Sequence, residues 1–462
     1  MSNVFDEDTI VAISTPPGEG GVGIVRLSGN AALPIAAKVF VSSKDKDIER
    51  EGQRVFHGHV HDAAGNMLDE VLLHVMRAPH SYTAEDVVEI NGHGGMAPLR
   101  AILDAVLEQG ARLARPGEFT RRAFVNGRID LSRAEAVIDV VRAQTRAALS
   151  AANTASAGML SRTLYALRDV LIDALAHIEA AVDFPEEDLP ELVNDALFER
   201  LQDARQRMCA LTHTADAGIR YREGVALAIV GKPNTGKSSL FNALLRDARA
   251  IVSKQPGTTR DRLEETITLD GVPARLIDTA GMRTTDNEVE AIGVEQARLA
   301  AEQAGMILFV VDASLSLSTE DTMLAEHLAA LEIPVVLVRN KTDLPAAAND
   351  DDHTLPIQCA AVCDVSAKTG DGLRPLEHQL ATLLLGESAP AADTPMLFRA
   401  HQKDSMRRAA QALQRLLDNK DASPEFLAAD VREALAAIGE ITGETTSEDV
   451  LDRIFASFCI GK

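Results

Sequence analysis

Apolar and polar residues alternate along the chain in several different ways, and each pattern predicts a different kind of structure. Between Thr9 and about Phe124, short apolar runs such as 10–13 and 71–75 are separated by Gly and Pro turns, with one helical stretch at 98–109. This mixture is typical of an α/β domain.

From about Asp130 to Arg220 the spacing of apolar residues becomes helical. They recur every three or four positions, at Leu160, Leu164, Leu167, Leu171, Leu175, Ile178 and Val182. Such spacing places an apolar stripe along one face of a long helix. Pro185 and Pro190 cannot continue that helix, so we expect the acidic run at 183–190 to be a solvated connection, or a segment that repels a wrong partner.

Strands and helices alternate again from Gly224 to about Leu385, which is typical of βαβ units. A Pro-containing linker at 389–395 follows, and helical spacing then returns at Leu413, Leu416, Leu417, Ala434, Leu435, Ile438 and Ile441. The simplest arrangement packs this last segment against the earlier helices. The α/β segment would then be inserted between two halves of one helical domain.

Composition sets the class of protein. A chain of 462 residues with 46% hydrophobic and 25% charged residues is expected to form two to four globular domains. The net charge of -23 restricts any RNA contact to a local surface or a shared one. The four cysteines lack the paired spacing of a zinc site, and no long apolar run predicts a membrane span, so we expect a soluble cytoplasmic protein.

Residues 231–238 read GKPNTGKS, between the apolar run 225–230 and a helical stretch. This is the context that a phosphate-binding loop requires. Backbone N–H groups would surround phosphate oxygens, Lys237 would neutralise them and Ser238 would hold Mg²⁺.

Motifs further along the chain identify the nucleotide. Asp278 and Gly281 end an apolar strand, which suits a metal-side carboxylate and a backbone N–H near the γ-phosphate. Asn340, Lys341 and Asp343 form Asn-Lys-x-Asp, in which Asp343 would accept hydrogen bonds from guanine N1 and the 2-amino group. Residues 366–368, Ser-Ala-Lys, would present a backbone N–H to guanine O6. The predicted ligand is therefore GTP.

One position departs from small regulatory GTPases. Met282 stands where those proteins carry the glutamine that orients the attacking water. Another group must do this work, and nearby candidates are Arg283, Asp286, Glu288 and Glu290. Asn234 in the phosphate loop is either a turn former or a ligand of a monovalent cation, and the residues alone leave both open.

Several strings together resemble one family, MnmE (also TrmE), the tRNA modification GTPases. They are GKPNTGKS with its Asn234, GTTRD at 257–261, DTAGMR at 278–283, TPPGEGGVGIVR at 15–26 and FCIGK at 458–462. The resemblance covers the whole chain in one order. It implies an N-terminal α+β folate-binding-like and dimerisation domain at 1–125, helical parts at 126–223 and 386–462, and an inserted Ras-like P-loop GTPase domain at 224–385.

The resemblance also implies an activity and partners. Members form homodimers and act with the flavoprotein MnmG, as a heterotetramer, to add an aminomethyl or carboxymethylaminomethyl group at C5 of the wobble uridine of certain tRNAs. GTP hydrolysis is K⁺-dependent and coupled to dimerisation of the G domains. The alternative is a GTP-switched ribosome or RNP assembly factor without modification activity, although no basic RNA-binding appendage is visible.

In the family, 5-formyltetrahydrofolate or a related tetrahydrofolate is contacted by positions that match Arg26, Glu89, Arg128 and Lys462. The cationic groups suit the folate carboxylates, and Glu89 suits the donor edge of the pterin. Cys459 is either a nucleophile near the folate or a small apolar anchor of the tail. His93, in NGHGG at 91–95, could lie near substrate, whereas its glycines favour a strand-to-helix turn.

The same matching assigns K⁺ ligands, Mg²⁺ ligands and catalytic residues in the G domain. Asn234, Ser253, Gln255 and Thr258 match K⁺ ligands, Ser238 and Thr259 match Mg²⁺ ligands, and Glu290 matches the glutamate that orients water. Arg283 and Asp278 complete the predicted catalytic set with Cys459. The other predicted nucleotide contacts are Thr235, Gly236, Lys237, Ser239, Lys254, Pro256, Gly257, Thr279, Ala280, Gly281, Asn340, Lys341, Asp343, Ser366, Ala367 and Lys368.

Overall fold

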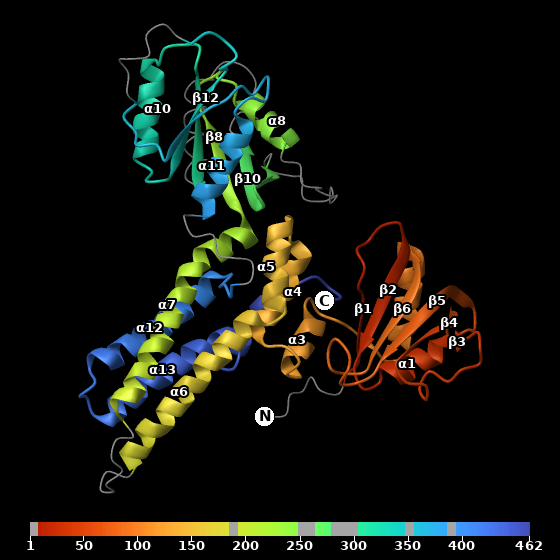
Figure 1. The fold of residues 1–462 in the computed structure, drawn as a ribbon. Helices are drawn as coiled ribbons and strands as arrows, with labels where there is room; N and C mark the ends of the chain where they lie inside the picture. The colour runs from red at the N-terminus through yellow and green to blue at the C-terminus, as the bar shows by residue number, and fades with distance from the viewer. Residues whose placement is uncertain (1–7, 184–192, 248–263, 279–303, 347–354, 386–393) are drawn as a thin grey trace. The chain divides into compact units, whose positions relative to one another are not determined.

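The computed structural model describes residues 8–183, 193–247, 264–278, 304–346, 355–385 and 394–462. By its internal contacts the chain divides into two compact units (Figure 1). The first unit comprises Met1–Ile138 and Ala436–Lys462, and the second comprises Asp139–Leu435. The two ends of the chain therefore belong to one unit.

The first unit is built on a seven-stranded sheet in the order β3-β4-β5-β6-β2-β1-β7. Its neighbouring strands are antiparallel except for the parallel pair β1 and β7. The strands are β1 Ile10–Ile13, β2 Gly20–Ser28, β3 Phe40–Ser42, β4 Arg54–His61, β5 Met67–Met76, β6 Val87–Gly94 and β7 Arg112–Leu113.

Two helices, α1 Ala32–Val39 and α2 Met96–Glu108, close the core of this sheet. Leu33, Leu99 and Ile102 from these helices are buried against Leu73 and Ile90 of the strands. A second cluster joins α3 Glu118–Val125 and α4 Leu131–Arg142 to α14 Glu448–Ala456. Through this cluster the last residues of the chain are fixed to the N-terminal fold.

The helices of the second unit include α5 Arg146–Ser156, α6 Met159–Asp183, α7 Asp195–Glu223 and α12 Ala400–Asp418. The Asn194 side chain caps α7 by accepting from the Leu197 N–H. Helices α7 and α12 are in contact, and both carry buried apolar residues, such as Met208 on α7 and Leu413 and Leu416 on α12. The late helical segment therefore packs against an earlier helix, as the sequence pattern predicts. Helix α13, Pro424–Thr442, runs from the second unit into the first.

The second unit also contains a six-stranded sheet in the order β13-β12-β11-β8-β10-β9, in which only the pair β9 and β10 is antiparallel. The strands are β8 Val225–Val230, β9 Glu264–Leu269, β10 Val272–Asp278, β11 Met306–Asp312, β12 Val335–Asn340 and β13 Ala361–Asp364. The helices beside them are α8 Lys237–Asp247, α10 Thr319–Ala329 and α11 Leu373–Leu385. We call this part the nucleotide domain.

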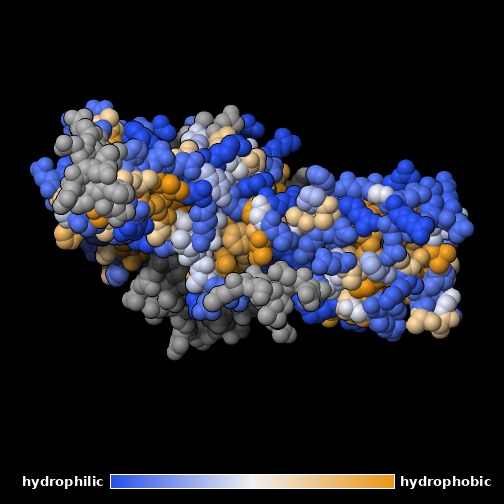
Figure 2. Space-filling view, turned by 90° about the horizontal axis from the view of Figure 1, so that it is seen from below, coloured by the Kyte–Doolittle hydropathy of each residue, from blue (hydrophilic) through white to orange (hydrophobic). Residues whose placement is uncertain are grey.

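Apolar clusters cover both faces of the nucleotide-domain sheet, so β8 is buried along its whole length. The fold confirms the predicted class: an α+β N-terminal part, a helical part and a Ras-like P-loop domain. No helix among the described ranges is long and apolar enough to cross a membrane. The face shown in Figure 2 is mostly hydrophilic, with small hydrophobic areas.

Candidate functional site

The phosphate loop connects the end of β8 to the start of α8. A Cβ on Gly236 would collide with the Asn340 side chain, and Gly236 has φ of 94°, so only glycine fits this position. Asn234 has φ of 62°, in the left-handed region that Asn tolerates better than most residues. This conformation fits a turn former and equally leaves the exposed Asn234 side chain available to a cation.

Lys237 lies at the start of α8, and its ammonium group is directed into the loop. Its Nζ donates to the carbonyl oxygens of Gly231 at 2.7 Å and Lys232 at 2.6 Å. The Ser238 hydroxyl is in the same first turn, and Ser238 is exposed. A lysine, a hydroxyl and the N-terminal end of a helix fit a phosphate with its Mg²⁺.

Asn340 connects three of the predicted motifs. It is 2% exposed, and its Nδ2 donates to the Thr235 carbonyl in the phosphate loop at 2.9 Å. Its Oδ1 accepts from the backbone N–H of Ala367 at 3.0 Å. The phosphate loop, Asn-Lys-x-Asp and Ser-Ala-Lys therefore meet at the carboxyl edge of the parallel strands, where ligands of such sheets bind.

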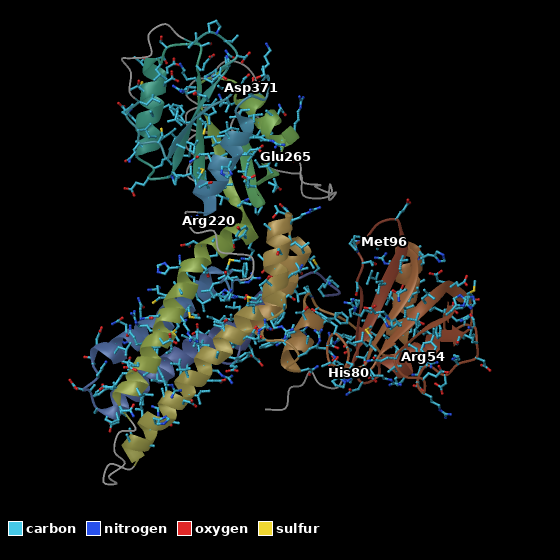
Figure 3. All side chains as sticks on the ribbon, in the orientation of Figure 1. Arg54, His80, Met96, Arg220, Glu265 and Asp371 are labelled. Atoms are coloured by element: carbon cyan, nitrogen blue, oxygen red, sulfur yellow. The ribbon has the colours of Figure 1, made fainter. Side chains whose placement is uncertain are left out.

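Asp343 is held by the Ser-Ala-Lys segment. Its Oδ1 accepts from the Ser366 hydroxyl at 2.8 Å, and the Lys368 ammonium lies 4.0 Å from its Oδ2. The Ser366 backbone N–H donates to the carbonyl of Asp371 at 2.9 Å, which closes the turn. Asp371 is labelled in Figure 3. A carboxylate fixed in this way can accept both N–H groups of guanine, which adenine cannot donate.

Lys341 has a second role that the motif does not reveal. Its Nζ lies 2.5 Å from Oδ2 of Asp312, at the end of β11. Burial acts to raise the pKa of Asp312, but hydrogen bonds from Lys341 and Ser314 outweigh it and hold this pKa below its usual value. Sequence reasoning missed Asp312, although an acid that ends the apolar run 306–311 is a signal of a strand-end site.

Several predicted residues of the nucleotide site lie outside the described residues. These are Ser253, Lys254, Gln255, Pro256, Gly257, Thr258, Thr259, Thr279, Ala280, Gly281, Arg283, Asp286, Glu288 and Glu290, and Met282 lies outside them as well. Asp278 ends β10, but its side chain is also outside the described part. Their roles remain predictions. Among the described residues, no three His, Cys, Asp or Glu side chains form a metal cluster.

The first unit gathers the predicted folate residues Arg26, Glu89 and Lys462. Arg26 and Glu89 are direct cross-strand neighbours on β2 and β6, with 2.7 Å between Nε and Oε1. Arg26 Nη1 also donates to the Gly461 carbonyl at 2.9 Å. The Ser14 hydroxyl donates to the same carbonyl at 3.2 Å. The C-terminal tail is thereby docked beside the Arg26–Glu89 pair.

Lys462 ends this tail and is partly buried. Burial and the nearby positive charge of Arg26 lower the pKa of its ammonium group, and the Cys459 and Glu89 charges oppose the shift. A partly buried cation next to another cation is a suitable place for an anionic ligand. Cys459 itself is exposed, and its carbonyl accepts from the Gly117 N–H at 3.3 Å.

Arg128 lies over an aromatic ring in the same unit. Its guanidinium carbon is 5.1 Å from the ring centroid of Tyr82, whose hydroxyl is 2.9 Å from the Thr120 Oγ1. Burial raises the pKa of Tyr82, while the charges of Arg128 and Arg26 oppose the shift. Tyr82 thus contacts the predicted Arg128. Sequence reasoning missed it because no local motif marks it.

His93 is paired rather than free for substrate. Its Nδ1 lies 2.7 Å from Oδ1 of Asp69, and its backbone N–H donates to Oδ2 at 2.7 Å. The hydrogen bond with Asp69 raises the pKa of His93. Since β6 ends at Gly94 and α2 begins at Met96, the segment forms the strand-to-helix connection that its glycines predict.

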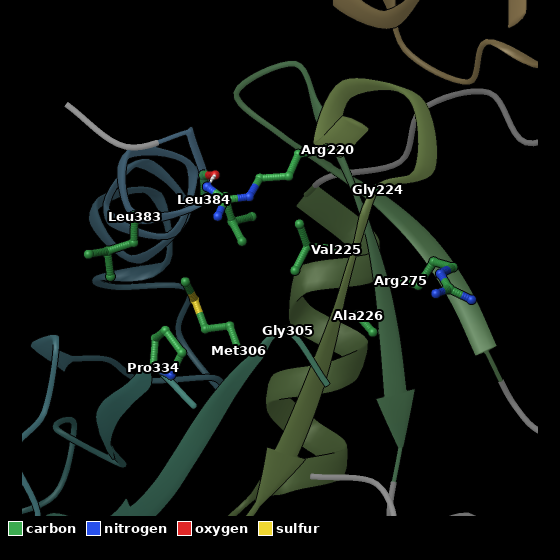
Figure 4. Close-up of a pocket in the computed structure, with 10 residues that line it drawn as sticks. All are labelled: Arg220, Gly224, Val225, Ala226, Arg275, Gly305, Met306, Pro334, Leu383 and Leu384. Atoms are coloured by element: carbon green, nitrogen blue, oxygen red, sulfur yellow. Dashed lines mark hydrogen bonds between the residues drawn. The ribbon is translucent and has the colours of Figure 1, made fainter. Parts of the chain in front are cut away.

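A cavity of about 290 Å³ lies at the other edge of the nucleotide-domain sheet (Figure 4). It is lined by the first residues of β8 and β11, with Pro334, Leu384 and Arg220 around them. Arg220, near the end of α7, donates to the Leu384 carbonyl at the end of α11. This cavity is at the amino edge of the strands, so it is separate from the nucleotide site.

The fold and the site define the class. A phosphate loop between β8 and α8, which Asn340 ties to the Ser-Ala-Lys segment that holds Asp343, is the arrangement of a P-loop GTPase.

Comparison with known proteins gives the family. The family model described as MnmE helical domain matches residues 131–459, and the one described as GTP-binding protein TrmE N-terminus matches residues 9–128. The chain belongs to the MnmE family of tRNA modification GTPases.

Curated relatives match over nearly their whole length. The tRNA modification GTPase MnmE of Chloroflexus aurantiacus is 47% identical over 459 residues, which cover 98% of this chain and 100% of the relative. The protein of the same name from Heliobacterium modesticaldum is 44% identical, covering 98% and 99%. These matches confirm the prediction of a GTP hydrolase that takes part in tRNA modification, with GTP and Mg²⁺ as ligands.

Solved structures match a smaller part of the chain. Era from Aquifex aeolicus, bound to GDP and aluminium fluoride, is 28% identical. The match has a TM-score of 0.27 and covers 41% of this chain and 66% of the other. The family assignment therefore rests on the family models and the curated relatives.

Proposed function

We propose that GTP hydrolysis in the nucleotide domain is K⁺-dependent and coupled to dimerisation of two such domains. With the flavoprotein MnmG, this cycle serves to add a carboxymethylaminomethyl or aminomethyl group at C5 of the wobble uridine of certain tRNAs. The protein works as a cytoplasmic homodimer within a heterotetramer. In this proposal the N-terminal domain spans 1–125, the helical domain spans 126–223 and 386–462, and the G domain spans 224–385.

We also propose that the first unit binds a tetrahydrofolate, and the docked C-terminal tail supports this part of the proposal. Lys462 and Arg26 place two cationic groups near the carboxylate of Glu89, in the unit that contains both ends of the chain. Cations suit the carboxylates of a tetrahydrofolate such as 5-formyltetrahydrofolate, and a carboxylate suits the donor edge of its pterin. Arg128, stacked over Tyr82, supplies a further cation. Cys459 lines this site and is not assigned a covalent step.

In the nucleotide domain we assign K⁺ to Asn234, Ser253, Gln255 and Thr258. The K⁺ would place positive charge beside the phosphates, where other GTPases use an arginine finger. Ser238 and Thr259 hold Mg²⁺, with Asp278 on the metal side. Glu290 orients the attacking water, because Met282 cannot. Arg283 is a second candidate for a catalytic group beside the phosphates.

The cation requirement is tested by measuring GTP hydrolysis in K⁺ and in Na⁺ at equal ionic strength. We expect hydrolysis roughly tenfold faster in K⁺, since charge placed at the developing oxyanion is worth at least this much. Asn234→Ala should remove most of the preference. Asn419→Ala, at an exposed asparagine that follows α12, is the matched control and should keep it. Equal rates in the two salts would remove the cation from the mechanism.

A further inference from the structure

Lys232 is the second residue of the phosphate loop, and its side chain leaves the loop toward α10. Its Nζ lies 2.6 Å from Oδ2 of Asp321 and donates to the Ser318 hydroxyl at 2.7 Å. The Lys232 side chain is 23% exposed and that of Asp321 is 3% exposed. The contact is therefore a largely buried, hydrogen-bonded ion pair between residues far apart in sequence.

Asp321 also forms part of the N-terminal cap of α10. Ser318 is the N-cap and Asp321 the third residue of the helix, and together they form a reciprocal capping box. Oδ2 of Asp321 accepts from the Ser318 backbone N–H at 2.9 Å and also meets Lys232. This cap is complete without Lys232, so the lysine adds a connection that the helix itself does not need.

The backbone carbonyl of Lys232 accepts two hydrogen bonds inside the loop. It accepts from the Thr235 hydroxyl at 3.0 Å and from the Lys237 ammonium at 2.6 Å. The other side of the loop is fixed by Asn340, which donates to the Thr235 carbonyl. Holding the Lys232 side chain thus fixes the carbonyl that orients Lys237, the phosphate-binding lysine.

We propose that Lys232 is a positioning residue, and that its pair with Asp321 holds the phosphate loop in its nucleotide-binding shape by anchoring it to the first turn of α10. The pair also neutralises Lys232, so Lys237 provides the loop's lysine charge at the phosphates. A pre-shaped loop lowers the ordering cost of binding. The effect belongs to nucleotide affinity rather than to the hydrolytic step.

The test uses the full chain with three single variants, Lys232→Met, Lys232→Arg and Asp321→Asn, and the double variant Lys232→Met with Asp321→Asn. Measured quantities are the Kd for GDP, KM and kcat for GTP, and the thermal unfolding midpoint. Asp321→Asn keeps the volume of the side chain and an oxygen that can accept from Ser318. Asp270→Asn is the matched control, because Asp270 makes an exposed pair with His378 in the same domain, 2.9 Å from Oδ2 to Nδ1.

We expect Lys232→Met and Asp321→Asn each to raise Kd and KM by about tenfold, as loss of one hydrogen bond to a charged group predicts. The kcat should stay within about twofold, and the double variant should be no weaker than the single ones, since both remove the same contact. Lys232→Arg should restore most of the affinity. Asp270→Asn should bind like the original protein.

Two results would overturn the proposal. Unchanged Kd and KM in folded Asp321→Asn and Lys232→Met, with only a lower unfolding midpoint, would reduce the pair to a stabiliser of α10. Tighter nucleotide binding by Asp321→Asn would mean that Asp321 withholds the charge of Lys232 from the phosphates instead of positioning the loop.

Discussion

The nucleotide domain and the first unit both gather polar groups, but they do so by different routes. In the nucleotide domain, backbone groups and short motifs follow the ends of neighbouring strands, and Asn340 joins them. In the first unit, side chains come from distant parts of the sequence: Arg26 is 63 positions from Glu89 and 435 positions from Gly461. A backbone site can be predicted from a motif, whereas an assembled side-chain site depends on the completed fold.

The comparison also predicts how the two sites fail. In the nucleotide site a single fixed carboxylate, that of Asp343, would recognise the base, so a change of this residue should change which nucleotide binds. A site that shares its charge among Arg26, Arg128 and Lys462 should lose affinity gradually.

The largest effect is expected for Asp343→Asn. This change removes the carboxylate charge and replaces one of its two acceptor oxygens by a donor, so it should weaken GTP binding by about a hundredfold, since two charge-assisted hydrogen bonds give way to at most one neutral one. The variant should instead bind and hydrolyse XTP, whose base offers an acceptor where guanine offers the amino group. Binding of 5-formyltetrahydrofolate should not change. A variant that keeps GTP preference over XTP would show that Asp343 does not read the base.

A smaller effect is expected for Lys462→Met. Removal of one charge from the docked tail should weaken binding of 5-formyltetrahydrofolate by about tenfold, measured by titration calorimetry. GTP hydrolysis by the isolated protein should stay within about twofold. Lys46→Met is the matched control, because Lys46 makes a surface pair with Glu51 in the same unit. If Lys462→Met bound the folate as tightly as Lys46→Met does, the tail would not contact this ligand.

The smallest effect is the pH dependence of that affinity. Burial and Arg26 lower the pKa of Lys462 below its usual value. A bound carboxylate favours the charged ammonium and raises this pKa, so binding takes up a proton. Affinity should fall as pH rises through the lowered pKa, by about threefold over one pH unit around it. Lys462→Met should bind with a flatter pH profile, and identical profiles would exclude Lys462 as the titrating group.

Much of the fold could be predicted from residue patterns alone. The apolar runs 10–13 and 225–230 have the bounds of β1 and β8 because they are short buried strands between clear turn signals. Because parallel strands end at the same edge of a sheet, the order of the GTPase motifs predicted that they lie together at that edge. The return of a helical segment against α7 followed from its apolar stripe.

The parts that could not be predicted depend on side chains brought together by packing. Tyr82 reaches Thr120, 38 positions away, and Lys232 reaches Ser318, 86 positions away. Neither contact has a local spacing rule. The position of Arg26 beside Gly461 likewise requires that both ends of the chain belong to one unit. The resemblance to a family named Arg26 and Lys462 but did not supply their geometry, and it named neither Tyr82 nor Lys232.

Nucleoside analysis of tRNA can decide whether GTP hydrolysis by this chain serves wobble uridine modification. Total tRNA would be isolated from a strain that lacks the gene and from the same strain carrying the intact gene, then digested and measured by mass spectrometry. If hydrolysis serves this modification, we expect aminomethyl or carboxymethylaminomethyl uridine derivatives to be absent from the first strain and present in the second. Identical wobble uridines in both strains would contradict this expectation and favour an assembly factor without modification activity.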